Sequence, residues 1–253
     1  MPGASPVFST RLATTPEELI AAQRLRYGVF VRELGGGGAL VDHVNGLERD
    51  RFDEFGDHLL LRDETKGAVV GVYRLMRAEQ AEKAGQFYTE DEYDLAPLMA
   101  SKRRLLELGR SCLHPDYRGG TAMIHLWSAL AEYVEQHKID LLFGVASFHG
   151  TDVDKLAAPL SMLHHNHLAP PTLRVRAKGP QRQAMDLLEP GQFDRRKAMV
   201  DTPALIKAYL RLGGVVGEGA FVDHTFNTTD VCLILDTARL NARQRKIYER
   251  GPG

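Results

Sequence analysis

Apolar residues at helical spacing mark the first predicted element of the chain. They follow Thr15-Pro16-Glu17-Glu18, a capping box in which Thr15 is the N-cap and Pro16 is the first helical residue. The buried stripe of this helix comprises Leu19, Ala22, Leu25, Val29 and Phe30. We expect the helix to run to about Leu34 and to end in the flexible glycine run 35–38.

Two apolar segments that flank a polar turn predict a β-hairpin. Residues 58–62 and 68–76 are the strands, and residues 63–67 form the turn between them. The next segment, residues 79–94, holds six acidic residues and one lysine. This charge pattern predicts a solvated connection that is helical only in part.

A strand, a helix and a second strand follow one another in the middle of the chain. Residues 105–112 form the first strand, residues 123–134 carry apolar side chains at helical spacing, and residues 139–147 form a buried strand. This order is a crossover unit, so we expect its two strands to be parallel neighbours.

The rest of the chain predicts shorter elements. They are a helix around residues 154–165, an edge strand at 173–176, a helix at 203–212, a strand at 231–235 and a basic helix from Thr237 onward. The order of elements predicts a mixed α/β sheet with one crossover in its middle.

Composition restricts the class of protein. The chain has 253 residues, 43% of them hydrophobic, which is enough to bury a full core. Its net charge of −1 gives no overall attraction to nucleic acid or lipid. It holds two cysteines and no apolar run of the roughly 18–20 residues that a membrane span needs, and from its first twenty residues we expect no secretory signal. We therefore expect a globular cytoplasmic protein that does not bind nucleic acid.

The glycine turn before the central helix is a candidate anion site. Gly119 and Gly120 precede a helix whose N-terminal N–H groups favour a phosphate, and Arg118 adds a charge-assisted partner. In the alternative interpretation the glycines serve only the sharp turn, and both interpretations stay open.

Two charged residues lie within the first strand of the crossover unit. Glu107 and Arg110 face opposite sides of an ideal sheet unless a bulge near Gly109 realigns them. A buried Glu is a candidate general base, and a nearby Arg would keep it ionised. On these two residues alone, we favour the alternative of a surface ion pair.

Three other polar groups do not require a metal site. The first group lacks the spacing of a calcium loop and predicts a solvated or amine-binding loop; it comprises Asp50, Asp53, Asp57 and His58. The histidines of residues 164–167 lack a second ligand cluster and suit a helix terminus. Cys112 with His114 or His149 is a candidate nucleophile pair, but Cys112 lies in an apolar strand, where a small buried thiol is the commoner role. We therefore expect no metal.

Two segments are strongly basic. Residues 172–199 hold seven basic and three acidic residues, and residues 239–250 hold five basic and one acidic residue, so each carries +4. Both could be solvated faces. The more specific interpretation is a surface for an acidic protein partner, which electrostatic steering would favour.

The motifs of the chain, taken in order, resemble a known superfamily. Those similar to acyl-homoserine-lactone synthases of the GNAT superfamily are residues 25–34, Asp50-Arg51-Phe52-Asp53, Arg74-Leu75-Met76 and Glu107-Leu108-Gly109-Arg110. Residues 35–38, all glycine, replace the tryptophan that those enzymes carry beside their S-adenosylmethionine site. Residues 204–213 and 223–231 look like ornithine Nα-acyltransferases, which make lyso-ornithine lipid. With them the resemblance spans nearly the whole chain.

The resemblance implies a fold, a reaction and partners. The fold would be a single GNAT-like acyltransferase domain over residues 1–253, with a mostly antiparallel central sheet flanked by helices. It would have one parallel crossover around the pyrophosphate-binding turn and a helical, basic insertion at about 150–215. The enzyme would move a 3-hydroxyacyl chain from acyl carrier protein to the α-amine of L-ornithine, giving lyso-ornithine lipid. Acyl carrier protein would dock through residues 172–199 and 239–250. No cofactor would be tightly bound, and a peripheral membrane contact could release the product.

The resemblance also implies roles for the candidate residues. Glu107 would be the base that deprotonates the amine, directly or through water, and Arg110 would orient Glu107 or hold the amino-acid carboxylate. For the amino acid, Arg26 and Arg74 would contact the carboxylate, and Asp50 and Asp53 would contact a cationic side chain. For the donor, Arg118, Gly119 and Gly120 would bind the phosphopantetheine phosphate. The backbone N–H groups of Ser111 and Cys112 would donate to the thioester oxygen.

Other functions stay open at this point. They are acylation of another amino acid such as glutamine, acyl-homoserine-lactone synthesis from S-adenosylmethionine, acetyl transfer from acetyl-CoA to small amines, and a catalytically silent acyl-binding regulatory module.

Overall fold

The computed structural model describes residues 5–240, whose contacts group into two compact units. The first unit contains the chain up to Gly85 and Leu108–Lys138. The second contains Gln86–Glu107 and the described chain from Ile139 onward. Strand β5, Leu105–Leu113, contributes residues to both units.

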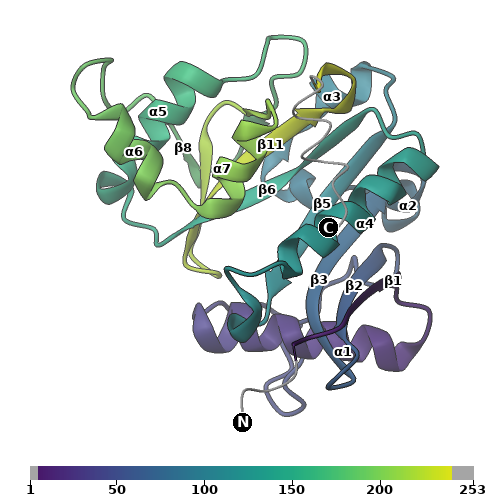
Figure 1. Ribbon diagram of the computed structural model, residues 1–253. Helices are drawn as coiled ribbons and strands as arrows, with labels where there is room; N and C mark the ends of the chain where they lie inside the picture. The colour runs from purple at the N-terminus through teal and green to yellow at the C-terminus, as the bar shows by residue number, and fades with distance from the viewer. Residues whose placement is uncertain (1–4, 241–253) are drawn as a thin grey trace. The chain divides into compact units, whose positions relative to one another are not determined.

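The first unit combines an antiparallel sheet with two long helices (Figure 1). Its strand order is β1-β2-β3-β5, and the pairs β1–β2 and β2–β3 are antiparallel. Its elements are β1 (Phe8–Leu12), α1 (Pro16–Arg26), a π-helix η1 (Tyr27–Glu33), β2 (Asp57–Asp63), β3 (Ala68–Arg77), α2 (Ala78–Ala84), the later part of β5, a 3-10 turn η3 (Pro115–Tyr117) and α4 (Ala122–Gln136).

The predicted N-cap Thr15 and the helix that it opens are confirmed, although Glu18 accepts from the N–H of Thr14 rather than from that of Thr15 as a complete capping box requires. Thr15 Oγ1 accepts a hydrogen bond from the Glu18 N–H, and Glu18 Oε2 accepts one from the Thr14 N–H at 2.8 Å. The helix continues past Arg26 as η1 and ends at Glu33, close to the predicted end. The predicted hairpin is confirmed as well, because β2 and β3 pair around a short turn.

Helices α1 and α4 cover opposite faces of the first unit's sheet. Leu25 of α1 packs in one cluster with Leu60 and Val72. A Cβ atom added to Gly71 would lie 2.9 Å from a side-chain carbon of Leu126 in α4. Gly71 and Val72 are consecutive, and consecutive strand residues point to opposite faces. Glycine at position 71 therefore lets α4 pack closely on the sheet.

The second unit holds the parallel strands of the crossover and a set of antiparallel strands. Its strand order is β5-β6-β11-β10-β8, with β9 also paired to β11. The elements are η2 (Tyr88–Asp91), β4 (Tyr93–Asp94), α3 (Ala96–Ala100), the first residues of β5, β6 (Leu141–His149), η4 (Val153–Leu156), α5 (Ala157–His167), β7 (Arg176–Ala177), β8 (Arg182–Gln183), α6 (Arg195–Asp201), α7 (Ala204–Arg211), β9 (Val215–Val216), β10 (Ala220–Asp223), β11 (Thr228–Asp236) and η5 (Thr237–Arg239).

The predicted crossover is confirmed. Strands β5 and β6 pair in parallel, from Leu105 opposite Leu141 to Glu107 opposite Phe143. The pairs β6–β11, β10–β11, β8–β10 and β9–β11 are antiparallel. The chain thus has the GNAT-like α/β architecture that the sequence predicts, with a mostly antiparallel mixed sheet and helices around it.

Helices α5, α6 and α7 occupy the segment predicted as a helical, basic insertion. The predicted helix 203–212 is α7, and Gly213 follows it at a positive φ of 86°. The histidine-rich residues 164–167 form the last turn of α5, as predicted. His165 Nε2 donates to the Leu188 carbonyl at 2.9 Å, and its ring stacks on Phe193.

Three details of the predicted fold are wrong. The edge strand expected at 173–176 is reduced to β7, because the alternating burial of Leu173 and Val175 comes from core packing rather than from a ladder of strand pairs. Segment 79–94 is helical in part, as predicted, through α2 and η2, but it is not solvated, since Phe87 and Tyr93 are buried. Other strands were not predicted, because they are short and carry no clear alternation; they are β1, β4, β8, β9 and β10.

The C-terminal prediction can be followed only at its start. Residues 237–239 form η5, and the rest of the predicted basic helix lies outside the described residues. Among the described helices, none combines the length and the apolar character that crossing a membrane requires.

Candidate active site

Six charged side chains of the first unit meet in one buried group, which we call the ion cluster. They come from α1, from the segment between η1 and β2, from β3 and from β5. Five of them were singled out by the sequence motifs. The members are Arg26, Glu48, Asp50, Asp53, Arg74 and Arg110.

Asp53 connects two of the arginines. Its Oδ1 accepts hydrogen bonds from Arg26 Nη1 at 2.7 Å and from Arg74 Nη1 at 2.9 Å. Arg26 Nε also donates to Glu48, and Arg74 Nη1 also donates to Asp50. Each of these arginines therefore binds two carboxylates. A substitution at one residue of the ion cluster should then also alter the ion pairs of the other residues.

Arg110 lies at the more exposed edge of the ion cluster. Its Nε is 3.2 Å from Glu48 Oε1, and its Nη2 is 2.9 Å from Asp50 Oδ2. The side chains of Arg110 and Asp50 are 12% and 17% exposed, whereas the Arg26 side chain is 0% exposed. Arg110 also has a φ of +52°, which interrupts the regular strand beside Gly109, where the sequence allowed for a bulge.

The charges of the ion cluster stabilise one another against the cost of burial. Burial raises the pKa of the Asp50 carboxyl, but the nearby Arg74 and Arg110 outweigh it and hold the pKa well below its usual range. Arg26 and Arg74 likewise outweigh burial and lower the pKa of Asp53. With three cations and three anions, the group is neutral as a whole.

Polar neighbours complete the surroundings of Asp53. Gln23 Nε2 donates to Asp53 Oδ2 at 3.0 Å, and His58 Nε2 donates to the Asp53 carbonyl at 2.9 Å. Burial lowers the pKa of His58, so the ring stays neutral near pH 7. Gly56 lies against Arg74, where a Cβ atom would be 2.9 Å from Arg74 Cγ. We predicted a solvated or amine-binding loop here, but most of its charged side chains instead bind other residues of the protein.

Glu107 belongs to the second unit and has a different environment. It is 3% exposed, and its Oε2 and Oε1 accept hydrogen bonds from the Tyr88 N–H at 3.0 Å and the Thr89 N–H at 2.6 Å. This carboxylate therefore holds the start of η2. The surface ion pair that we favoured on the two residues alone does not describe a Glu as buried as this one.

The glycine turn of the first unit is formed as predicted. Gly119 has a φ of +76°, and a Cβ atom on either Gly119 or Gly120 would meet no atom within 4 Å. Within residues 5–240, no backbone carbonyl accepts a hydrogen bond from the N–H groups of Gly119, Gly120 or Thr121. The turn therefore offers open N–H donors at the start of α4.

Arg118 beside this turn is held by a carboxylate. Its Nη1 and Nη2 donate to the two carboxylate oxygens of Glu33 at 2.5 and 2.7 Å, and its Nη2 donates to the Leu113 carbonyl at 3.2 Å. The hydrogen bond from Arg118 lowers the pKa of Glu33. Both side chains are more than one-third exposed, so an anion in solution can reach them.

Ser111 and Cys112 follow in β5. Cys112 is buried and packs in the same cluster as Leu25 and Val72, and burial raises the pKa of its thiol to about 12. A thiol in this state is not a nucleophile near neutral pH, which agrees with the interpretation as a small buried residue. Ser111 beside it is half-buried.

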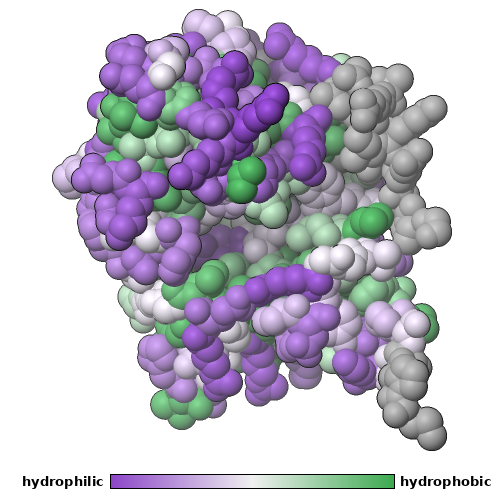
Figure 2. Space-filling model, turned by 60° about the vertical axis from the view of Figure 1, so that its left-hand side comes forward, coloured by the Kyte–Doolittle hydropathy of each residue, from purple (hydrophilic) through white to green (hydrophobic). Residues whose placement is uncertain are grey.

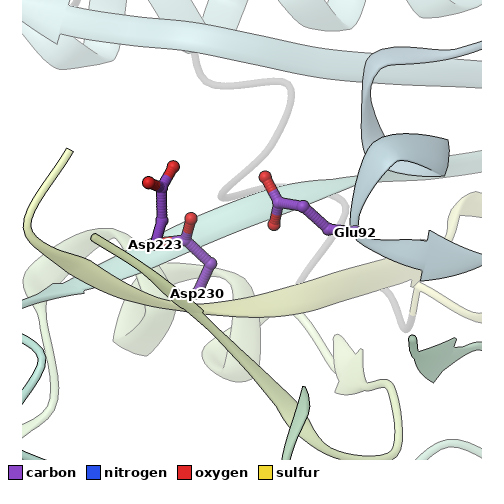
Figure 3. A group of neighbouring side chains, drawn as sticks. All are labelled: Glu92, Asp223 and Asp230. Atoms are coloured by element: carbon purple, nitrogen blue, oxygen red, sulfur yellow. The ribbon is translucent and has the colours of Figure 1, made fainter. Parts of the chain in front are cut away.

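The second unit also brings three carboxylates together. The side chains of Glu92, Asp223 and Asp230 point toward one another, with oxygen atoms within 4.8 Å (Figure 3). Asp223 Oδ1 also accepts hydrogen bonds from the N–H groups of Thr225 and Phe226. Asp223 and Asp230 lie in the segment that resembled ornithine Nα-acyltransferases, but nothing in the sequence linked them to Glu92, which lies in a distant acidic stretch.

Comparisons with known sequences identify the class of protein. Residues 25–128 match the acetyltransferase (GNAT) domain family. The chain is 58% identical over 248 residues to a curated protein of Rhodobacter capsulatus named L-ornithine N(alpha)-acyltransferase. This alignment covers 96% of the chain and 95% of the relative.

Solved structures show the same fold at low sequence identity. The acyl-homoserine-lactone synthase LasI is 16% identical, with a TM-score of 0.50 over 96% of this chain and 95% of its own. FeeM, an N-acyl amino acid synthase from uncultured soil microbes, is 13% identical, with a TM-score of 0.53 over 95% of this chain and 98% of its own.

The match to the GNAT domain family and the identity to a full-length relative both indicate an acyltransferase, and the fold agrees with this class. The chain therefore belongs to the GNAT-fold acyltransferase family whose curated members are named L-ornithine N(alpha)-acyltransferase.

Proposed function

We propose that the chain transfers a 3-hydroxyacyl group from the phosphopantetheine arm of acyl carrier protein to the α-amine of L-ornithine, giving lyso-ornithine lipid. The observation that carries this proposal is the 58% identity, over nearly the full length of both chains, to a relative named for ornithine acylation. The donor and the product follow from the resemblance of the sequence motifs.

The reaction is an acyl transfer between sulfur and nitrogen. The neutral α-amine attacks the thioester carbonyl, an amide C–N bond forms and the C–S bond breaks. The amine loses a proton to a base, and the thiolate leaves with the electron pair and is then protonated. The protein must therefore supply a base that takes the proton, a site for the amino acid that receives the acyl group, and a site for the acyl thioester that donates it.

Glu107 is the proton acceptor in this proposal, acting directly or through a water molecule. Its two oxygens each accept one backbone N–H, from Tyr88 and Thr89. An ionised carboxylate has about four acceptor positions, so a carboxylate held by backbone N–H groups can still accept a proton or a hydrogen bond from water. The two N–H groups also fix the orientation of the carboxylate, as a base at a defined distance requires.

The exposed edge of the ion cluster is the part suited to the acceptor. Arg110 and Asp50 have accessible side-chain surface, and they offer one cation and one anion. Ornithine carries a carboxylate and a side-chain ammonium, which match these charges. Arg26, Arg74 and Asp53 are more deeply buried, so we assign them to positioning Arg110 and Asp50.

The glycine turn is the site proposed for the donor's phosphate. Open N–H groups at Gly119 and Gly120 and the guanidinium of Arg118 suit the phosphate of phosphopantetheine. The phosphate would replace the Glu33 carboxylate as the partner of Arg118. The backbone N–H groups at Ser111 and Cys112 are proposed donors to the thioester oxygen.

Acyl carrier protein remains the proposed partner for the basic segments. Within residues 172–199, Arg176 and Arg182 already lie near Glu218, at 3.2 and 3.9 Å. Arg239 at the start of the other segment pairs with Asp236, and most of residues 239–250 lies outside the described chain. Lys178 and the cations of α6 are exposed, so they are the described ones open to an acidic partner.

Expression of the chain in a host that lacks amino-acid lipids tests the proposal. Mass spectrometry of the lipid extract should show ornithine joined through its α-amine to a 3-hydroxyacyl chain. The matched control is the Glu107→Gln variant, for which the product should disappear. Acyl-glutamine or acyl-homoserine lactone in place of the ornithine product would contradict the proposal.

A further inference from the structure

An open hollow lies between α5 and α6 of the second unit and uses none of the proposed catalytic residues. Its volume is about 530 Å³. The lining residues are Met162 and His167 from α5, and Arg195, Arg196 and Met199 from α6. Helices α5 and α6 are on the left of Figure 1, and this side comes forward in Figure 2, where small hydrophobic areas lie among hydrophilic ones.

The walls of the hollow are held in place by specific hydrogen bonds. The buried Ser161 of α5 accepts a hydrogen bond from the Leu188 N–H at 2.9 Å, and His165 donates to the Leu188 carbonyl. Asp194 caps the start of α6 by accepting the Arg196 N–H at 2.7 Å. The segment that joins the two helices is thereby tied to α5 before α6 begins, so contacts within the protein hold the two walls in place.

The lining combines an apolar floor with a cationic rim. Met162 and Met199 provide flexible, polarizable thioether side chains, which adapt to the shape of an apolar ligand. Arg195 and Arg196 are exposed, and neither forms an ion pair with any residue in the range 5–240. Burial and the nearby Arg195 lower the pKa of His167, so the ring is neutral and the two arginines supply the charge at the hollow.

We propose that this hollow binds an anionic amphiphile, meaning an apolar chain that ends in a carboxylate or a phosphate. The chain would lie over the two methionines, and the anionic end would meet Arg195 and Arg196. The volume falls in the usual range for small-molecule sites. Lys197 and Val200, which are exposed on α6, extend the same pairing of positive charge with apolar surface.

A concave floor distinguishes this ligand class from a protein partner. A protein interface of ordinary size needs about 800 Å² on each side, with large side chains that anchor it. The hollow is formed by five residues of two helices, which suits a single chain better. Binding at the hollow goes beyond the proposed reaction, because it requires neither the amino-acid acceptor nor the acyl transfer.

Titration calorimetry with monomeric laurate tests the proposal on the full chain. Wild-type protein should bind laurate, and the Arg195→Gln/Arg196→Gln variant should bind it at least about tenfold more weakly because two charge-assisted contacts are lost. The matched control is Lys178→Gln/Arg182→Gln, which removes two exposed cations of the same basic segment outside the hollow and should bind as wild type does.

Two further measurements follow. The first distinguishes the apolar contact from the charged contact, and the second tests whether the ligand can come from a membrane. Met199→Gln should weaken laurate binding while leaving the binding of inorganic phosphate unchanged, because only the chain contact is altered. Flotation with phosphatidylglycerol vesicles, compared with phosphatidylcholine vesicles, reports whether the anionic amphiphile can come from a bilayer.

Two results would overturn the proposal. The first is that neither laurate nor phosphatidylglycerol vesicles bind the wild-type protein; if the Arg195→Gln/Arg196→Gln variant then also loses the binding of acyl carrier protein, the hollow is a protein-docking surface. The second is that this variant binds laurate and vesicles as strongly as the wild type.

Discussion

The first unit contains arginines in two contrasting environments. Arg26 and Arg74 are buried among carboxylates of the ion cluster, each bound to two of them. Arg118 shares a single carboxylate, Glu33, and both partners are partly exposed. The difference shows that burial decides which ion pair can open, because a buried arginine would leave its carboxylates uncompensated whereas an exposed one can exchange its carboxylate for another anion.

The two environments also differ in energy. Removing one member of a buried ion pair leaves a charge without compensation and typically costs about 3–5 kcal/mol. An exposed pair such as Arg118–Glu33 contributes about 0–1 kcal/mol, since water screens it and side-chain entropy opposes it. Substitutions in the ion cluster should therefore change stability first, and substitutions at the turn should change donor binding first.

The largest expected effect comes from Asp53→Asn. This change keeps the shape of the side chain but removes the negative charge between Arg26 and Arg74. We expect the free energy of unfolding to fall by about 3–5 kcal/mol. Urea denaturation measures it, with Glu33→Gln as the control, for which the loss should stay within about 1 kcal/mol. Equal losses in the two variants would remove the distinction between the environments.

The second prediction concerns pH. The pKa values of Asp50 and Asp53 are lowered in the folded protein. Their stabilisation is therefore fully present above the unfolded pKa of about 3.9 and is lost as pH falls through the folded values. The stability difference between wild type and Asp53→Asn should stay constant from pH 7 to about 5 and shrink below about pH 4. A difference that grows on acidification would contradict these pKa directions.

The third prediction concerns the exposed arginine. Arg118→Gln should weaken the use of the acyl donor by about 1.5–3 kcal/mol, a loss of roughly tenfold or more in kcat/KM, because a charged hydrogen bond to the phosphate disappears. Its effect on stability should stay within about 1 kcal/mol. Arg24→Gln, an exposed arginine of α1, is the matched control. Unchanged donor kinetics in Arg118→Gln would exclude the turn as the phosphate site.

The smallest effect is expected for Cys112→Ala. The thiol is buried and its pKa is raised to about 12, so it does not act as a nucleophile. We expect a stability loss of about 1 kcal/mol from the smaller side chain and little change in kcat. Trapping of an acyl group on the wild-type protein but not on this variant, seen by intact-protein mass spectrometry, would show that the cysteine takes part in the reaction.

The sequence correctly predicted those helices and strands whose signals lie in neighbouring residues of the chain. The capping residues before α1, the turn between β2 and β3, and the strand-helix-strand order around α4 each depend on neighbours in the sequence. Alternation at residues 173–176 failed as a strand signal because alternating burial does not require strand pairing. Strand β10 was missed because it has four residues and depends on its pairing with β11.

The sequence predicted which residues belong to the candidate site better than it predicted which residues they bind. Motif resemblance singled out Arg26, Asp50 and Asp53, yet no local pattern showed that they would bind one another rather than a ligand. Glu48 was missed because it looked like one more residue of an acidic loop, although it is 1% exposed and pairs with two arginines. The partners of Glu107 were equally unpredictable, because backbone N–H groups carry no signal in the sequence.

The most direct test of the proposed reaction is a competition assay with the purified protein. The mixture contains 3-hydroxyacyl-acyl carrier protein with equimolar L-ornithine, L-glutamine and S-adenosylmethionine, and mass spectrometry identifies the products. The proposed reaction predicts ornithine acylated on its α-amine, with the side-chain amine free, as the main product. A main product of acyl-glutamine, acyl-homoserine lactone or ornithine acylated on its side chain would contradict it.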